Sequence, residues 1–261
     1  MDYRSITLEI TDGVARLTLN QPERLNSLSA EMNAQILHAL LHCEASSEVR
    51  VLLIQAKGRG FCAGADLNQA SMKGSAPDLG DVIQQQYNPI AEKLLSMAKP
   101  VVCAVNGVTA GAGVNFVLCC DIAVAAKSAS FLQAFTKIGL MPDMGGTFFL
   151  PRLVGTARAM GLALLAERLS AEEAEKWGLI WKCVEDEQLP AEADAIARKL
   201  ASMPPLALQM TKRALRESTQ HSFVEQVTLE RDLQRVLGFT QDFAEGANAF
   251  LEKRAPHFVG K

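Results

Sequence analysis

The chain has 261 residues, 49% of them hydrophobic, and a formal net charge of −3. This length allows one large domain, or one domain with an appendage, and it is sufficient for a substantial core. The weakly acidic balance argues against a nucleic-acid partner, because neutralising phosphates requires clustered Lys and Arg.

The nearest basic cluster is Lys212, Arg213 and Arg216, whose helical spacing we interpret as a solvated face. The six cysteines form no CxxC pair, which predicts reduced thiols, no metal site and a cytoplasmic protein. Residues Pro100 to Cys120 carry no charge, but their asparagines and glycines favour a buried strand, loop and helix over a membrane span. We therefore expect no membrane partner.

The first half alternates strands and helices. Alternating apolar and polar residues flank Thr11-Asp12-Gly13, which predicts a β-hairpin. The segments that follow are expected to be, in order, a helix after Ser29, a strand at 49–55, a helix at 81–97, a strand at 101–108, a helix at 111–120 and a strand at 121–126. This order predicts an α/β core with parallel strands and right-handed crossovers.

The second half is mostly helical. Helices are expected over "TARAMGLALLAERL" and "SAEEAEKWG", the latter with a capping box of Ser170 and Glu173 and a C-cap at Gly178. From about Gln188 every segment has helical periodicity. We expect a core at 1–187 and a C-terminal helical region at 188–261, packing on the core or on a neighbouring subunit.

Several catalytic motifs are absent from the sequence, among them GxSxG, the P-loop and HExxH. Histidine catalysis is not expected, because the four histidines lie at 38 and 42 on one helix and at 221 and 257 in the tail. The turn "VNGVTAGAGVNF" lacks both the GxGxxG spacing and the later acidic residue of a dinucleotide site.

Two loops rich in small residues, "GRGFCAGADL" and "VTAGAGVN", present backbone N–H groups without a nucleophile. Such donors suit a developing oxyanion, and the lone charge of "GLMPDMGGTFFLP", Asp143, would then carry the proton. On residue type alone a helix cap is slightly favoured for Asp143. Apolar neighbours (Met141, Met144, Phe135 and Phe148) would raise its pKa.

These motifs, followed by "FTKIGLMPDMGGTFFLPRLVG", resemble the crotonase (enoyl-CoA hydratase/isomerase) superfamily over nearly the whole chain. The resemblance implies a crotonase-like spiral of ββα units, assembled as a homotrimer or hexamer. It also implies acyl-CoA thioester substrates, with coenzyme A as part of the substrate and no other cofactor. The oxyanion-hole donors would be the N–H groups of Ala65 and Ala112, the latter where the family usually has glycine.

The resemblance also implies the acid/base residue. Hydratases of this family use two glutamates, whose positions hold Asn115 and Phe135 here, whereas Asp143 stands where dienoyl-CoA isomerases keep a catalytic aspartate. "PDMGGTFFLPR" and "FLEKRAPHFVGK" are similar to the isomerases of phenylacetate catabolism. We expect conversion of ring-1,2-epoxyphenylacetyl-CoA to oxepin-CoA, a shift of the double bond of 3-enoyl-CoA to 2-enoyl-CoA, or both.

The remaining expected substrate and CoA contacts are Arg24, Ala63, Asp66, Leu67, Gly111, Asn115, Phe135 and Lys253, with Lys253 supplied by an adjacent subunit's tail. The alternatives within the fold are a hydratase, a dehalogenase or a thioesterase. A non-catalytic CoA-binding or RNA-binding homologue and a dinucleotide oxidoreductase are the alternatives from other classes.

Overall fold

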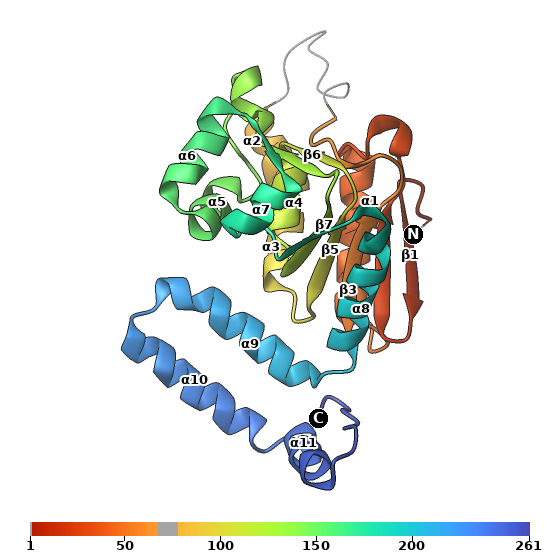
Figure 1. Ribbon diagram of the computed structural model, residues 1–261, viewed down its shortest axis with the longest axis vertical. Coiled ribbons are helices and arrows are strands. Elements are labelled where there is room, and N and C mark those ends of the chain that lie inside the picture. Colours follow the sequence, from red (N-terminus) through yellow and green to blue (C-terminus); the bar gives the residue numbers. More distant parts are fainter. Residues whose placement is uncertain (1, 67–77) are drawn as a thin grey trace.

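The computed structural model describes residues 2–66 and 78–261, and its central element is a six-stranded sheet of order β1-β2-β3-β5-β7-β10 (Figure 1). Its strands are β1 (Ile6–Thr11), β2 (Val14–Leu19), β3 (Val51–Ala56), β5 (Val101–Val105), β7 (Ile122–Ala126) and β10 (Lys182–Val184). Strands β1 and β2 are antiparallel and all later neighbours are parallel, as the sequence predicts. The expected hairpin is confirmed, because Asp12 and Gly13 adopt φ of +53° and +78° between the paired residues Thr11 and Val14.

The local sequence patterns did not predict a second sheet, of order β4-β6-β8-β9. Its strands are β4 (Gly60–Cys62), β6 (Val108–Ala110), β8 (Ser130–Leu132) and β9 (Arg168–Ser170). Each of the first three follows a strand of the large sheet, so the chain repeatedly makes a long strand, a short strand and then a helix. The spiral of ββα units is thereby confirmed.

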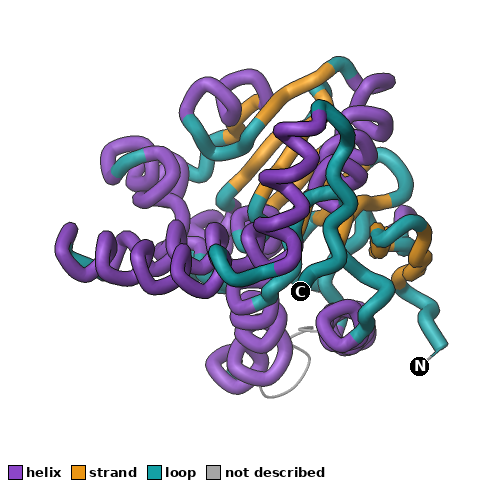
Figure 2. Tube along the Cα trace, turned by 90° about the horizontal axis from the view of Figure 1, so that it is seen from below, coloured by secondary structure: helices purple, strands orange, loops and turns teal. Residues whose placement is uncertain are grey.

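Helices cover the sheets, and in the view of Figure 2 the strands lie together with helices flanking them. The helices of the core are α1 (Ala30–Ala45), α2 (Leu79–Val82), α3 (Asn88–Ser96), α4 (Ala112–Leu118), α5 (Gly146–Val154), α6 (Thr156–Leu165), α7 (Ala171–Trp177) and α8 (Leu189–Ala201). Shorter segments are η1 (Pro22–Arg24), η3 (Ala134–Ile138), η4 (Asp186–Gln188) and a π-helical turn, η2 (Ile83–Tyr87), that joins α2 to α3. Helix α8 packs against β3, β5 and β7.

Local sequence signals set several helix ends. The Ser29 hydroxyl accepts a hydrogen bond from the Met32 N–H, 3.2 Å away, and so caps α1. Ser170 caps α7 in the same way and Gly178 ends it in the left-handed conformation. One expectation was wrong: the helix over "TARAMGLALLAERL" ends at Leu165, and residues 168–170 form β9 because they pair with β8.

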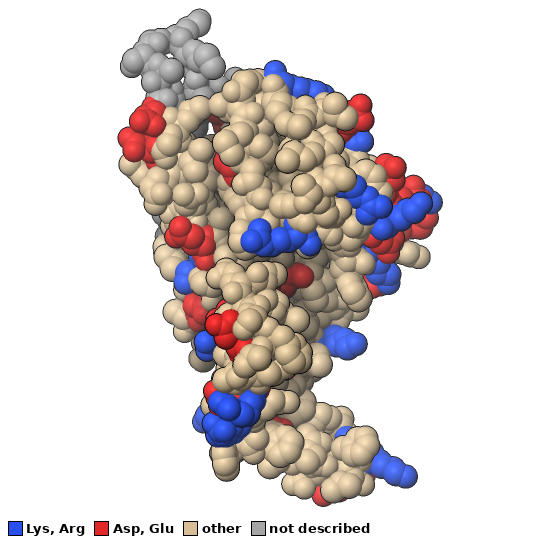
Figure 3. Space-filling view, turned by 90° about the vertical axis from the view of Figure 1, so that its left-hand side faces the viewer, with Lys and Arg blue, Asp and Glu red and all other residues tan. Residues whose placement is uncertain are grey.

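The C-terminal arm consists of α9 (Pro205–Glu217), η5 (Ser218–Gln220), α10 (Phe223–Leu237) and α11 (Gln241–Glu252), and it projects from the core (Figures 1 and 3). No residue of α9 or α10 is buried. The large apolar side chains exposed on the arm are Leu215, Phe223, Val224, Val227, Val236, Phe239, Phe243, Phe250 and Leu251.

The attachment of the arm corrects one interpretation of charge. Lys212 and Arg216 are not solvated, because both pair with the Asp121 carboxylate at 2.7 and 2.6 Å, and the Lys212 side chain is only 10% exposed. Arg213 is more exposed, with 57% of its side chain accessible, and it pairs with Glu217 of the same helix. Spacing alone could not reveal that Asp121, ninety residues earlier, lies opposite one face of this helix.

The uncharged segment from Pro100 to Cys120 forms β5, β6 and α4, as expected for a buried strand, loop and helix. Among the helices that the structure describes, none is both long and apolar enough to cross a membrane.

Candidate active site

Two glycine-containing loops follow adjacent strands of the small sheet. Strands β4 and β6 are parallel, so their carboxyl ends lie at the same edge, where Gly64 and Gly111 follow them. Both glycines have positive φ, +87° and +52°, a conformation that L side chains rarely adopt. The sequence places glycine where each strand must turn into the next segment.

The two loops are in close contact. A Cβ atom on Gly64 would lie 2.7 Å from the Ala110 carbonyl oxygen and 3.4 Å from the Ala112 nitrogen. A Cβ atom on Gly113 would lie 2.4 Å from the Cys62 carbonyl oxygen. Larger residues would therefore force the loops apart, and with them the backbone of Ala65 and Ala112.

The backbone N–H groups of Ala65 and Ala112 are available as donors. Leu28 bonds to both neighbours of Ala65, donating to the Gly64 carbonyl (2.7 Å) and accepting from the Asp66 N–H (3.4 Å), so the Ala65 N–H points away from it. Ala112 is the first residue of α4, where an N–H has no partner within the helix. Within residues 2–66 and 78–261, neither N–H donates a hydrogen bond.

Asp143 lies in the loop between η3 and α5, and it does not cap the helix. The N-cap of α5 is Gly145, and no side chain accepts a hydrogen bond there, so the capping interpretation was wrong. The loop is held by its backbone: the Asp143 carbonyl accepts from the Gly146 N–H at 2.8 Å, while Met144 and Gly145 adopt φ of +46° and +79°.

The Asp143 carboxyl group is largely withdrawn from water. Its Oδ1 atom is buried and has no hydrogen-bond partner in the described part of the chain. Burial raises the pKa of Asp143 to about 6, because the ionised carboxylate loses hydration without gaining a cation. Of the apolar neighbours expected from the sequence, Met144 and Phe135 are buried, whereas Met141 is 67% exposed.

Asn115 and Phe135, which the sequence resemblance places at the positions of the glutamates in hydratases, lie close to this loop. The fully buried Asn115 donates from Nδ2 to the Asp143 carbonyl (2.9 Å) and accepts at Oδ1 from Gln133 Nε2 (2.8 Å). The Phe135 ring faces Gly111, with Cζ 3.8 Å from the position a Cβ atom would take there. The structure thus brings Asn115, Phe135 and Gly111 together with Ala112 and Asp143.

The residues expected on the CoA side divide into two groups. Arg24 Nη1 lies 3.3 Å from the buried Asp66 carboxylate, and the Ala63 N–H donates to the Leu25 carbonyl at 2.9 Å, so these residues adjoin the Ala65 loop. Leu67 lies outside the described residues. Lys253, at the end of α11, lies in the arm, away from this group within one chain (Figure 1).

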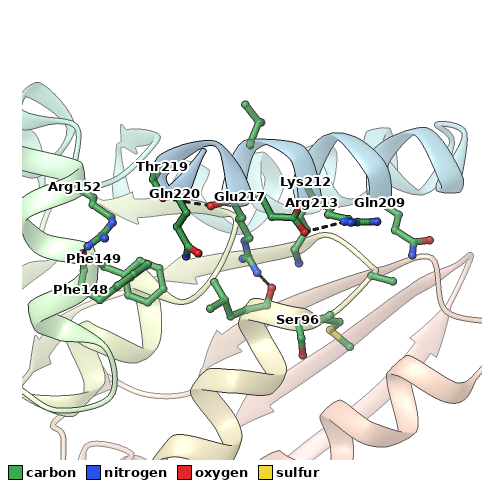
Figure 4. A pocket seen from close by; sticks show the side chains of 15 residues that line it. Ser96, Phe148, Phe149, Arg152, Gln209, Lys212, Arg213, Glu217, Thr219 and Gln220 are labelled. Atoms are coloured by element: carbon green, nitrogen blue, oxygen red, sulfur yellow. Dashed lines mark hydrogen bonds and ion pairs between the residues drawn. The ribbon is translucent and has the colours of Figure 1, made fainter. Parts of the chain in front are cut away.

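A pocket of about 500 Å³ lies elsewhere, between α3, α5 and α9 (Figure 4). Phe148, Phe149 and Arg152 line one side, and Lys212 and Arg213 line the side formed by α9. Neither Asp143 nor the two loops contribute to its walls. The sequence analysis expected Phe148 near Asp143, but its side chain lines this pocket instead.

Two neighbours of the site were missed by sequence analysis. Gln133 precedes η3 and is only 3% exposed. Tyr87 ends the π-helical turn, donates to the Leu28 carbonyl at 3.3 Å, and has its pKa raised to about 12 by burial and, less strongly, by the charge of Asp143. No local pattern distinguishes either residue, because each reaches the site through tertiary packing.

Comparison with known proteins agrees with this architecture. The family model for enoyl-CoA hydratase/isomerase matches residues 9–261. The chain is 50% identical to the 1,2-epoxyphenylacetyl-CoA isomerase of Escherichia coli (strain K12), covering 98% of each chain. It is 46% identical to a "probable enoyl-CoA hydratase" of Rhodobacter capsulatus over the full length of both.

Solved structures show the same fold. The crystal structure of an enoyl-CoA hydratase from Bacillus anthracis superposes with a TM-score of 0.92 at 31% identity, covering 99% of this chain and 100% of that one. Sequence and structure agree over essentially the entire chain. The protein therefore belongs to the enoyl-CoA hydratase/isomerase family and is an enzyme.

Proposed function

We propose that this enzyme isomerises acyl-CoA thioesters, with Asp143 as the acid/base and the N–H groups of Ala65 and Ala112 as the oxyanion hole. The observation that carries the proposal is the half-buried Asp143 carboxylate, whose buried Oδ1 atom has no partner in the described residues and whose pKa is raised to about 6. A base is most effective when its pKa lies near the working pH.

In the double-bond shift, the thioester oxygen accepts from both N–H groups. Asp143 removes a proton from C2 of a 3-enoyl-CoA, and the electron pair moves onto the thioester oxygen as a dienolate. The protonated carboxyl then returns the proton at C4, so the double bond lies between C2 and C3. One oxyanion-hole donor typically contributes about 3–4 kcal/mol in such a transition state.

The proposed substrates are 3-enoyl-CoA and ring-1,2-epoxyphenylacetyl-CoA, the latter going to oxepin-CoA. The 50% identity to the E. coli 1,2-epoxyphenylacetyl-CoA isomerase supports the aromatic substrate. In that reaction the same polarisation of the thioester would assist epoxide opening and ring expansion. We propose no cofactor beyond the CoA moiety of the substrate.

Hydration is the competing reaction, since the R. capsulatus relative carries a hydratase name. Addition of water by two carboxylates requires groups that exchange protons, and neither the amide of Asn115 nor the ring of Phe135 does so. We therefore expect isomerisation to exceed hydration.

We also propose that the chain assembles as a trimer or hexamer through the arm. Phe223, Phe239 and Phe250 are each more than 80% exposed, which is costly for a monomer in water. Such assembly would also provide the route by which Lys253 approaches a neighbouring site.

The experiment that tests the proposal is incubation with aromatic-ring and straight-chain acyl-CoA thioesters, with products identified by mass spectrometry. We expect isomers of unchanged mass from 3-enoyl-CoA and from the ring epoxide, and little hydration of crotonyl-CoA. Products heavier by one water from crotonyl-CoA, at a rate above isomerisation, would instead assign a hydratase.

A further inference from the structure

The carbonyl group of Asp143 accepts two hydrogen bonds, and one comes from a distant element. The Gly146 N–H donates to it at 2.8 Å and the Asn115 Nδ2 atom at 2.9 Å. Asn115 belongs to α4, the helix whose first residue is Ala112. One side chain therefore connects the helix that carries an oxyanion donor to the residue that carries the base.

Gln133 determines how the Asn115 amide is oriented. Its Nε2 atom donates to Asn115 Oδ1 at 2.8 Å. An amide oxygen can only accept and an amide nitrogen can only donate, so this bond directs Nδ2 of Asn115 towards the Asp143 carbonyl. Gln133 therefore donates to Asn115, and Asn115 donates to the Asp143 carbonyl.

Close packing leaves the Asn115 amide little freedom. A Cβ atom on Gly146 would lie 2.4 Å from Asn115 Nδ2, so glycine at this position allows the amide to reach the loop. Asn115 has no exposed surface and Gln133 is 3% exposed. A fully buried amide that already bonds to the protein through both polar atoms is a poor candidate for substrate contact.

The loop needs such support because its own backbone is unfavourable. Met144 and Gly145 both adopt positive φ immediately after Asp143, and for Met144 this conformation is uncommon. Without Asn115, the hydrogen bond from Gly146 would be the remaining restraint on the Asp143 carbonyl among the described residues.

We propose that Asn115 and Gln133 are positioning residues, which fix the Asp143 carboxyl relative to the Ala112 N–H through this chain of amide hydrogen bonds. The proposal rests on the function proposed for Asp143. It assigns a role to the position where the family's hydratases have a glutamate: the amide there orients the base and exchanges no proton itself.

The test compares Asn115→Leu, Gln133→Met and the double variant. Each substitution keeps a similar shape and removes the polar atoms. We expect Asn115→Leu to lower kcat for 3-enoyl-CoA isomerisation by about 10- to 100-fold, since small misplacements of a catalytic group have effects of this size, with KM changed less than about threefold. We expect Gln133→Met to lower kcat by about threefold to tenfold, and the double variant to resemble Asn115→Leu, because Gln133 acts through Asn115.

A matched control is Asn106→Leu. Asn106 Nδ2 also donates to a loop carbonyl, that of Gly58 at 2.7 Å, but that loop does not carry the base. We expect its kcat to stay within about twofold of wild type, as for changes away from the reacting groups. If Asn115→Leu proves unstable, Gln133→Met decides the question, because its effect on kcat is predicted independently.

A titration of the Asp143 carboxyl by 13C NMR separates this proposal from the function on which it rests. In Asn115→Leu we expect the pKa of Asp143 to fall from about 6 towards its ordinary value, because a loosened loop admits water. An unchanged pKa together with unchanged kcat in both single variants would overturn the positioning role. The two proposals can fail separately. If Asp143→Asn retains isomerase activity while the pKa of Asp143 still shifts in Asn115→Leu, Asp143 is not the base but Asn115 still positions it.

Discussion

The loop that carries Asp143 and the C-terminal arm differ in the groups that remain without a partner in a single chain. At the loop, the buried amides of Asn115 and Gln133 are used to hold the backbone, and among the described residues there the buried oxygens without a partner are Oδ1 of Asp143 and Oε1 of Gln133. On the arm, α9 and α10 bury no residue and large apolar side chains are exposed. The unsatisfied group at the loop is polar and suits chemistry, whereas the unsatisfied surface on the arm is apolar and suits association.

Among the changes at the loop, we expect Asp143→Asn to have the largest effect on activity. The change keeps the size of the side chain but removes the proposed base, and general acid/base catalysis contributes about 100- to 10,000-fold. We expect kcat for 3-enoyl-CoA isomerisation to fall by that factor, measured by the absorbance of the conjugated product. Asp186→Asn, at an exposed carboxylate that accepts from the Ser128 N–H, is the matched control and should retain activity.

The loops proposed to form the oxyanion hole are tested by Gly64→Ala. A Cβ atom there would lie 2.7 Å from the Ala110 carbonyl, so the Ala65 and Ala112 donors would separate. We expect kcat/KM to fall by about 100- to 1,000-fold, the usual effect of losing one donor. Gly155→Ala is the control, because Gly155 also has positive φ but nothing lies within 4 Å of its Cβ position. If kcat/KM falls equally in both variants, backbone strain and not separation of the loops explains the loss.

Much of the core was predictable because its signals are local. The hairpin at Asp12-Gly13, the Ser170 cap and the helix beginning after Gly111 each follow from one or a few residues. The small sheet was missed because strands of three residues show no usable periodicity. The residues of β9 were assigned to a helix because a local pattern carries no information on their pairing with β8, about forty residues earlier.

The candidate site shows the same division. Gly64, Gly111 and Asp143 attract notice from residue type and context, since glycine and a lone carboxylate in apolar surroundings both require explanation. Gln133 and Tyr87 do not, because only the fold brings them to the loop. The capping interpretation of Asp143 failed because the N-cap of α5 is Gly145, two residues after Asp143, and no side chain caps the helix.

The arm side is tested by Phe239→Glu, at a side chain that is 88% exposed in one chain. We expect wild type to sediment as a trimer or hexamer and the variant to shift towards smaller species, because burying an aromatic side chain contributes about 1.5–3 kcal/mol. Leu41→Glu, at a half-exposed leucine on α1 of the core, is the control. A monomeric wild-type protein at micromolar concentration would contradict the proposed role of the arm.

A smaller effect concerns stability. Since the pKa of Asp143 is raised above its unfolded value of 3.8 to about 6, its contribution favours folding below pH 3.8 and is lost as the pH rises through about 6. Asp143→Asn should therefore raise the free energy of unfolding above pH 6 by roughly 1–3 kcal/mol, and by little at pH 4 or below. Thermal unfolding at two pH values measures this, and no difference between them would indicate a hydrated carboxylate.

The most direct measurement of the central claim is the dependence of kcat/KM on pH for wild-type isomerisation. If Asp143 must be ionised to act as the base, kcat/KM should rise about tenfold per pH unit below the pKa of about 6 and become constant above it. An acid limb near pH 4, the ordinary range of an aspartate, would show that the acting group is not a buried carboxylate. A profile without an acid limb would contradict the assignment of Asp143 as the base.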